Sequence, residues 1–267
     1  MHDPRTGTAR EDTLAVEEPL EIRIAGDPVA VTMRTPGEDA DLALGFLFAE
    51  GIVGSAGDVG SIAHCGRPGE DGYGNVLEVV PAPGVALALD RVEATRRGTL
   101  TTAACGVCGR RTIADLVDAC APVSSGPVLP APVLTDAVRD LRRAQRVFAR
   151  TGGTHAAAAH APGGERLVAR EDVGRHNAVD KVIGALLREA RIGASRKGCG
   201  PALLVVSGRT SFEMVQKAAR AGIPVVASVS APTSLAVDLA VAMNVTLAGF
   251  VRGDALNVYA HPERIGR

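Results

Sequence analysis

The chain has 267 residues, of which 46% are hydrophobic and 3% aromatic, and it contains no tryptophan. A chain of this length buries a sizeable core, and a core of Ala, Val, Leu and Ile suits layered α/β packing. The 29 basic and 30 acidic residues give a formal net charge of -1, which argues against a surface devoted to nucleic acid or to a charged membrane. Since no apolar run is long enough for a membrane span or a secretory signal, we expect a cytoplasmic protein.

The first half of the chain predicts a small α+β domain, residues 16–130, behind a disordered lead-in of residues 1–15. Apolar residues alternate with polar ones at 20–24 and 29–33, which predicts two antiparallel strands joined by a short turn. Further strands are predicted at 60–64, 75–80 and 85–90.

One helix is predicted within this first domain. Thr35 has the position of its N-cap, Pro36 that of the first helical residue, and Glu38 that of the capping-box carboxylate. Gly51 marks its end, because glycine commonly follows the last turn of a helix.

A proline-rich stretch at 121–134 suggests a boundary, beyond which residues 131–267 form a second domain. A first helix is predicted to begin at Thr135 and to end at the glycine pair 152–153. Strands are then predicted at 154–161, 165–171, 201–207, 224–230 and 245–251, and helices at 176–190, 211–222 and 234–244. Uninterrupted apolar strands that alternate with amphipathic helices indicate a parallel sheet covered on both faces.

Four polar segments follow these strands, and the carboxyl ends of parallel strands meet at one edge of a sheet, where ligands bind. The segments are 172–177, 208–213, 231–234 and 251–254. Their glycines allow close approach of the backbone, and Ser or Thr at the start of the next helix offers donors that favour phosphate. We therefore expect an anionic ligand with one or more phosphates, such as a nucleotide.

Individual side chains in these segments have two interpretations each. The arginines would bind phosphate in bidentate fashion or would form surface ion pairs. They are Arg175, Arg209 and Arg252. The hydroxyl residues Ser207, Thr210 and Ser211 would donate to the ligand or would only cap helices, Thr210 in a capping pair with Glu213. His176 suits a proton carrier or a ligand donor as well as it suits a helix cap.

Two cysteines three positions apart, Cys105 and Cys108, stand out in the stretch TTAACGVCGRRT. A structural zinc site commonly needs two such pairs, and the other three thiols are isolated from one another. They are Cys65, Cys120 and Cys199. A thioredoxin-like pair needs a helix that starts at the first thiol, whereas Gly106 and Gly109 indicate a flexible loop.

Two enzymatic interpretations of the pair remain. A zinc deaminase would have H-x-E upstream of P-C-x-x-C, but His155 is followed by Ala157 where the glutamate belongs, and the cysteines precede it. The second interpretation is sulfur transfer, because a thiolate whose pKa is lowered by a neighbouring thiol and by two adjacent arginines is a good nucleophile toward a persulfide. This last reading uses every feature of the stretch.

Five longer motifs resemble one family, the formate dehydrogenase accessory sulfurtransferases, FdhD. They read CGVCG, TGGTHAA, REDVGRHNAVDKVIG, SGRTSFEMVQKAARAGIPVVASVSAPTSLAVDLA and LAGFVRGDALNVYAH. LALGFLFAEGIV in the first domain fits the same family. The resemblance extends over about residues 16–262.

The resemblance implies a fold and a reaction. The fold would be a cytidine-deaminase-like α/β sandwich in the C-terminal half, without a metal of its own, beside the smaller α+β domain with its flexible CxxC loop. The protein, a homodimer, would take persulfide sulfur from a cysteine desulfurase. It would pass this sulfur to the molybdenum bis(molybdopterin guanine dinucleotide) cofactor, the bound substrate, so that formate dehydrogenase becomes active.

Site residues follow from the same resemblance. Cys105 would carry the persulfide and Cys108 would assist it. The cofactor would be held by the segment of Phe250, Val251, Arg252, Gly253, Asp254 and Ala255, and by Ser207, Gly208, Arg209, Thr210, Ser211, Arg175 and His176. Two alternatives stay open: a cofactor carrier or chaperone with no sulfur chemistry, and a deaminase-like nucleotide enzyme with an unrecognised metal.

Overall fold

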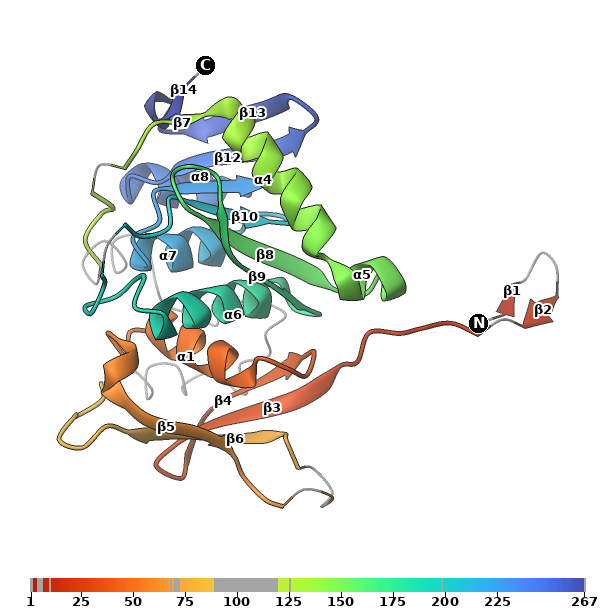
Figure 1. Ribbon diagram of the computed structural model, residues 1–267, viewed down its shortest axis with the longest axis vertical. Coiled ribbons are helices and arrows are strands. Elements are labelled where there is room, and N and C mark those ends of the chain that lie inside the picture. The colour runs from red at the N-terminus through yellow and green to blue at the C-terminus, as the bar shows by residue number, and fades with distance from the viewer. Residues whose placement is uncertain are drawn as a thin grey trace.

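Two β-sheets with helices between them form the body of the protein (Figure 1). The computed structural model describes residues 2–3, 7–9, 11–67, 69, 73–88, 120–124, 126–197 and 199–266. A four-stranded sheet belongs to the N-terminal lobe, and a six-stranded sheet belongs to the C-terminal lobe. The α/β class predicted from the sequence is confirmed.

The N-terminal lobe consists of a mixed sheet of order β4-β3-β6-β5 and one helix that packs on one face of this sheet. Its elements are β3 (Glu18–Ile24), β4 (Asp27–Arg34), α1 (Asp39–Ala49), a 3-10 turn (Ala56–Asp58), β5 (Val59–His64) and β6 (Val76–Pro81). β3 pairs antiparallel with β4 and parallel with β6. Alternate residues of β3 are buried, Leu20, Ile22 and Ile24, so the sheet has one face on α1 and one toward solvent.

The C-terminal lobe is a six-stranded sheet of order β13-β12-β11-β10-β8-β9. Its strands are β8 (His155–His160), β9 (Arg166–Asp172), β10 (Leu203–Val206), β11 (Val225–Ser228), β12 (Thr246–Arg252) and β13 (Ala255–Ala260). Its helices are α4 (Ala131–Ala144), α5 (Arg146–Thr151), α6 (Arg175–Arg188), α7 (Phe212–Arg220) and α8 (Ser234–Ala242). A short parallel pair, β7 (Leu129–Pro130) and β14 (Ile265–Gly266), and a 3-10 turn (Pro262–Arg264) complete this lobe.

Helices cover both faces of this sheet, as the sequence predicts. Neighbouring residues of β10 enter two different clusters: Leu204 and Val206 pack with α6, α7 and α8, whereas Leu203 and Val205 pack with α4. Because successive side chains of a strand point to opposite faces, the two clusters lie on opposite sides of the sheet.

The lobes meet where α1 crosses α6, with their backbones in contact (Figure 1). A Cβ atom on Gly45 of α1 would lie 1.9 Å from the carbonyl oxygen of Asp180, and one on Gly184 of α6 would lie 1.9 Å from that of Asp41. Only glycine fits at either position. The crossing joins the cores of both lobes into one hydrophobic cluster.

Several sequence predictions are corrected by the structure. The sheet is mixed rather than parallel, because β8 and β13 run against their neighbours. Residues 85–88 of the strand predicted at 85–90 are not in a strand, and β12 is followed by β13, although no strand is predicted after residue 251. β1 (His2–Asp3) pairs with β2 (Thr8–Ala9) within the predicted lead-in.

Two helix starts also differ from prediction. α1 begins at Asp39 behind Glu38, which has a left-handed conformation with φ 51° and makes no side-chain cap. Thr35 is therefore not an N-cap, and its polar groups contact the other lobe instead. α4 begins at Ala131 rather than at Thr135, because a proline in the first turn costs no helical hydrogen bond.

No helix in the described part of the chain combines the length and the apolar character needed to cross a membrane. The domain boundaries and the cytoplasmic location stay predictions.

Candidate functional site

Four strands of the large sheet end at the same edge, which we name the carboxyl rim. β8 pairs antiparallel with both β9 and β10, so these two run in one direction, and β11 and β12 continue parallel to β10. The rim consists of residues 172–177, 207–211, 228–234 and 250–255. The four polar segments singled out in the sequence therefore share one edge, although β8, which lies between β9 and β10, runs in the opposite direction.

Asp172 shapes the first rim segment. Its side chain is fully buried, and its Oδ1 accepts hydrogen bonds from the backbone N–H of Gly174 at 2.9 Å and from Asn177 Nδ2 at 3.1 Å. Its Oδ2 lies 2.8 Å from Lys181 Nζ. These contacts fix the turn that leads from β9 into α6, and so they fix the start of that helix at the rim.

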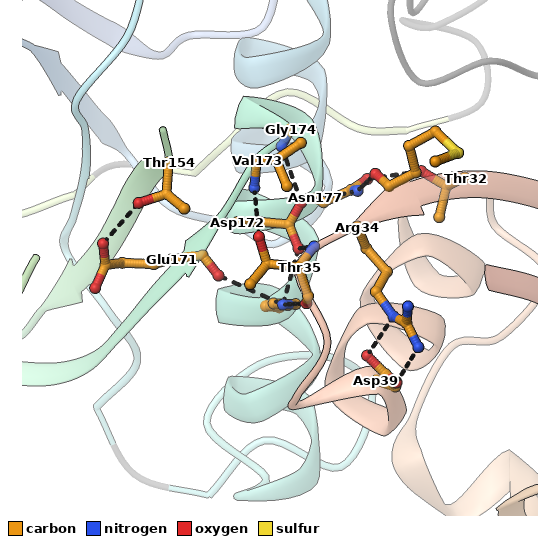
Figure 2. Close-up of polar contacts among 12 residues, drawn as sticks. Thr32, Arg34, Thr35, Asp39, Thr154, Glu171, Asp172, Val173, Gly174 and Asn177 are labelled. Carbon is orange, nitrogen blue, oxygen red and sulfur yellow. Dashed lines mark hydrogen bonds and ion pairs between the residues drawn. The ribbon is translucent and has the colours of Figure 1, made fainter. Parts of the chain in front are cut away.

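The N-terminal lobe holds the same segment from the other side. Figure 2 shows Thr35 directly beside Asp172 and Val173: the Thr35 N–H donates to Asp172 Oδ2 at 3.1 Å, and the Thr35 hydroxyl accepts from the Val173 N–H at 3.1 Å. Lys181 Nζ donates to the Thr35 carbonyl at 2.8 Å. Asn177 Nδ2 donates to the carbonyl of Met33 at 2.8 Å. The contacts of Asp172, Val173 and Asn177 in the motif EDVGRHN thus fix the position of the loop between β9 and α6.

Arg175 and His155 lie where the start of α6 approaches the segment that follows β10. A Cβ atom on Gly208 would lie 3.2 Å from His155 Nδ1 and 3.7 Å from Arg175 Cδ, so glycine there allows both side chains to approach. The Arg175 Nε is buried and has no hydrogen-bond partner within the described ranges. Burial and the Arg175 guanidinium lower the pKa of His155, so this imidazole is neutral at pH 7.

His176 lies against the start of α7. Its Nε2 is 3.0 Å from Glu213 Oε2 and 3.3 Å from Ser211 Oγ. Ser211 is the N-cap residue of α7, and Gly174 is that of α6. The prediction that Thr210 and Glu213 form a capping pair is therefore wrong, as is the interpretation of His176 as a helix cap.

Two hydroxyl residues of the middle segments, Ser207 and Thr233, make structural hydrogen bonds, whereas the hydroxyl of Thr210 makes none within the described residues. Ser207 Oγ accepts from the Ala156 N–H at 2.9 Å and ties β10 to β8. The backbone of Thr210 bonds to Ala231 and Thr233, while its hydroxyl is buried without a partner among the described residues. Thr233 caps α8 through its side chain.

The fourth segment, residues 250–255, is the tip of a β-hairpin and not a loop that enters a helix. Arg252 pairs with Ala255 across the turn of β12 and β13. Phe250 has a φ of 52° at an irregularity of this pairing, and 42% of its side chain is exposed. Asp254 is 2.8 Å from Arg139 of α4. Phe250, Arg252 and Gly253 are thus presented to solvent.

Two ends of the rim are well separated. Four strand spacings of about 4.8 Å lie between β9 and β12, so these two strands are roughly 19 Å apart across the sheet. Arg209, Thr210 and Ser211 lie between them. A single ligand that touches both ends must be elongated.

Two predicted residues, Cys105 and Cys108, lie outside the described residues. Two residues that contact the rim are not predicted as ligand-binding by the sequence: His155, beside Gly208, enters only as a zinc ligand, and Glu213, beside His176, enters only as a cap. The signal for Glu213 is its spacing, because Glu213 and Lys217 stand four apart on an amphipathic helix and so share one face.

Comparisons with known proteins identify relatives of this chain. Residues 15–266 match the model of the FdhD/NarQ family. A sulfur carrier protein FdhD of Anaeromyxobacter dehalogenans is 58% identical over 264 residues, which cover 98% of this chain and 91% of that protein. One of Mycobacterium tuberculosis is 51% identical, with 96% and 92% covered.

A solved structure is also similar. The crystal structure of a formate dehydrogenase accessory protein from Desulfotalea psychrophila matches with a TM-score of 0.74 and 26% identity, and the match covers 99% of this chain and 96% of that one. The similarity therefore includes both lobes.

Proposed function

Because the chain belongs to the FdhD/NarQ family, we propose that it is a sulfurtransferase for the maturation of formate dehydrogenase. It takes persulfide sulfur from a cysteine desulfurase onto Cys105, assisted by Cys108, and passes it to the molybdenum bis(molybdopterin guanine dinucleotide) cofactor. The name of its relatives, sulfur carrier protein, supports the transfer of sulfur. The name of the solved structure supports the link to formate dehydrogenase.

One observation carries the cofactor part of this proposal: α6 and α7 begin side by side at the carboxyl rim, and Arg175 at the start of α6 has a buried Nε without a hydrogen-bond partner among the described residues. α6 and α7 have 14 and 9 residues, and a helix N-terminus attracts phosphate through its free N–H groups and its dipole. Arg175 adds a positive charge whose Nε has no partner within the described part of the chain. A pyrophosphate suits this end of the rim.

The length of the rim supports a dinucleotide. A guanine nucleotide bound at α6 and α7 can extend along the rim toward the exposed Arg252 and Phe250, which belong to the strand four positions from β9 in the sheet. Both side chains are exposed and are therefore accessible to a ligand. In this proposal the C-terminal lobe is a deaminase-like layer that binds a cofactor and has no metal of its own.

Mass spectrometry after incubation with a cysteine desulfurase and cysteine tests the sulfur step. We expect one added sulfur atom on the peptide that contains residues 105–108, lost in Cys105→Ala and retained in Cys65→Ala. A chain that gains no sulfur contradicts the proposal.

The alternative is a cofactor carrier without sulfur chemistry, since the rim contacts described above involve no cysteine. It predicts that a variant with both Cys105→Ala and Cys108→Ala still matures formate dehydrogenase in cells. Loss of maturation by this variant, with its affinity for GDP unchanged, excludes the alternative.

A homodimer belongs to the same proposal. α8 is apolar on almost every side, and Leu235 and Val241 are 44% and 56% exposed. A helix of this kind is usually covered, and a second copy of the chain would cover it. Light scattering on Val241→Glu is expected to show more monomer than the wild type; an unchanged mass removes α8 from the interface.

A further inference from the structure

His155 is the first residue of β8, and its side chain lies on the α6 face of the large sheet. Ala157 packs in the cluster that contains α6, whereas Ala156 packs in the cluster that contains α4. Because side chains alternate along a strand, His155 shares the face of Ala157. Asp172, at the first position of the rim, lies directly opposite His155 in the pairing of β8 with β9. The imidazole is therefore placed at the rim, beside the start of α6.

Arg175, the first residue of α6, approaches the same place. A Cβ atom on Gly208 would lie 3.2 Å from His155 Nδ1 and 3.7 Å from Arg175 Cδ. Gly208 follows β10 and has no side chain, so the imidazole and the Arg175 side chain border one space at the end of this strand. A ligand group in this space can contact both residues.

Polar groups at this space lack protein partners within the described part of the chain. The Nε of Arg175 is buried without a hydrogen bond, as is the hydroxyl of Thr210, two residues after Gly208. The His155 imidazole has no hydrogen bond to a described residue. Buried polar groups are nearly always paired, and the oxygens of a phosphate would satisfy such donors.

The charges around His155 leave it next to a positive charge. Asp172, opposite in β9, is 2.8 Å from Lys181 and is balanced by it. Burial and the Arg175 guanidinium lower the pKa of His155, and Arg209, in the segment after β10, is exposed. The imidazole of the unliganded chain is therefore neutral near pH 7.

A phosphate in this space would reverse the sign of the local charge. The N-termini of α6 and α7 attract phosphate through their free N–H groups and dipoles. A negative charge within about 4–6 Å favours the charged form of a histidine. The ligand would thus promote protonation of an imidazole that the unliganded chain keeps neutral.

We propose that His155 binds the diphosphate of the ligand as an imidazolium, so that a proton enters the protein from solvent when the ligand binds beside Arg175. This inference rests on the proposed function, because it uses the cofactor site at the α6 end of the rim. It adds a binding residue that lies on β8, outside the four rim segments, and it makes binding stronger as pH falls. No covalent bond of the ligand forms or breaks, and the proton passes from water or buffer to a ring nitrogen.

One other pair at the rim titrates near neutral pH and must be separated from His155. His176 Nε2 and Glu213 Oε2 are 3.0 Å apart across the starts of α6 and α7. Burial raises the pKa of Glu213 to about 7, while the charges of Lys217 and Arg175 oppose this increase. A ligand that approaches Glu213 would also favour its protonated form, so Glu213 is the competing proton acceptor.

Calorimetric titration of the full chain with GDP-mannose measures the proton. Both phosphates of GDP-mannose are substituted, so the charge of this probe is constant near neutral pH, whereas a terminal phosphate such as that of GDP titrates at a pKa of about 6. Titrations at pH 7 in three buffers of different ionisation enthalpy give the number of protons taken up. We expect net uptake, and a Kd at least about threefold lower at pH 6 than at pH 7.5.

Three variants make the result specific. His155→Gln keeps a side-chain donor but cannot become charged, so it should lose most of the uptake and change its Kd less than about twofold over this interval. His261→Gln removes a histidine at the opposite edge of the sheet, where its carbonyl accepts from Thr246 at the start of β12, and should match the wild type. Glu213→Gln should retain the uptake. Uptake that mostly persists in His155→Gln overturns the proposal, and its loss in Glu213→Gln would then assign the proton to Glu213.

A nuclear magnetic resonance titration of the histidine rings identifies the residue directly and decides the question if His155→Gln does not fold. GDP-mannose should raise the pKa of His155 in the wild type. In the unliganded chain Arg175→Gln should raise it as well, because the Arg175 guanidinium lowers it. A His155 pKa that stays the same when the ligand binds overturns the inference alone. A wild-type chain that binds no GDP-mannose at pH 6 or 7.5 overturns the cofactor part of the proposed function and this inference with it.

Discussion

The two ends of the carboxyl rim are built in opposite ways. At the α6 end, Asp172, Lys181 and Thr35 form a buried network that spans both lobes and fixes the loop in front of Arg175. Figure 2 shows Asp172 and Thr35 of this network side by side. At the hairpin end, Arg139 and Asp254 meet in a pair that is 48% and 96% exposed. Buried networks hold side chains in defined positions, whereas exposed pairs contribute little. The first end therefore suits chemistry that needs fixed geometry, and the second suits adaptable contact with a large ligand.

The strongest test of this contrast removes one aspartate at each end. Asp172→Ala leaves Lys181 buried without its partner, and we expect a loss of about 3–5 kcal/mol in the free energy of unfolding. Asp254→Ala should change it by less than about 1 kcal/mol. Urea denaturation measures both, and similar losses would show that the two ends are equally rigid.

The second test acts on the lobe junction behind the α6 end. Gly184→Ala would place a Cβ atom 1.9 Å from the carbonyl oxygen of Asp41, so α1 and α6 must separate, at a cost of about 3 kcal/mol. Gly57→Ala is the matched control, because its Cβ would meet its nearest atom at 3.5 Å. Thermal melting should separate the two variants by many degrees; equal melting temperatures contradict the close crossing.

The third test uses pH. Because the pKa of Glu213 is raised from 4.5 to about 7 and that of Asp180 from 3.8 to about 6, the folded chain binds more protons than the unfolded chain across this interval. Stability contributed in this way is present at low pH and falls as pH rises toward 7. Glu213→Gln should flatten the curve by about 1–3 kcal/mol. Urea midpoints between pH 5 and 8 measure the difference, and parallel curves would contradict it.

The smallest expected effects concern the ligand. Arg175→Ala should weaken binding of GDP at least about tenfold, since a partly buried charged donor is lost. Arg252→Ala, on the exposed hairpin, should weaken it only a few-fold. Calorimetric titration with GDP compares them directly. A larger loss for Arg252 would move the main phosphate contact to the hairpin.

Secondary structure was predictable wherever burial follows a simple period. Strands β3 and β10 show alternating and continuous apolar residues, respectively, and both were found close to their predicted bounds. β13 was missed because only one of its six residues, Ala260, is buried, so its sequence lacks the apolar signal of a core strand. The predicted start of α1 is wrong because the local capping pattern at Thr35 carries no information about Asp172. This residue of the other lobe accepts a hydrogen bond from the Thr35 N–H.

The candidate site was predictable only in outline. Polar segments after strands located the rim, since strand direction alone brings their ends together. His155 was not assigned to the rim because its place depends on β8 running against β9 and β10, and chain order does not give strand direction. The sequence predicts a cap at Glu213 and not a partner of His176, because His176 lies 37 positions earlier in the sequence.

The glycine crossing of α1 and α6 limits how the molecule can move. Where two helix backbones touch, with no side chains between them, neither can slide or tilt without a clash or a void. The contact therefore resists sliding and tilting at this point, and we expect the two lobes to move together.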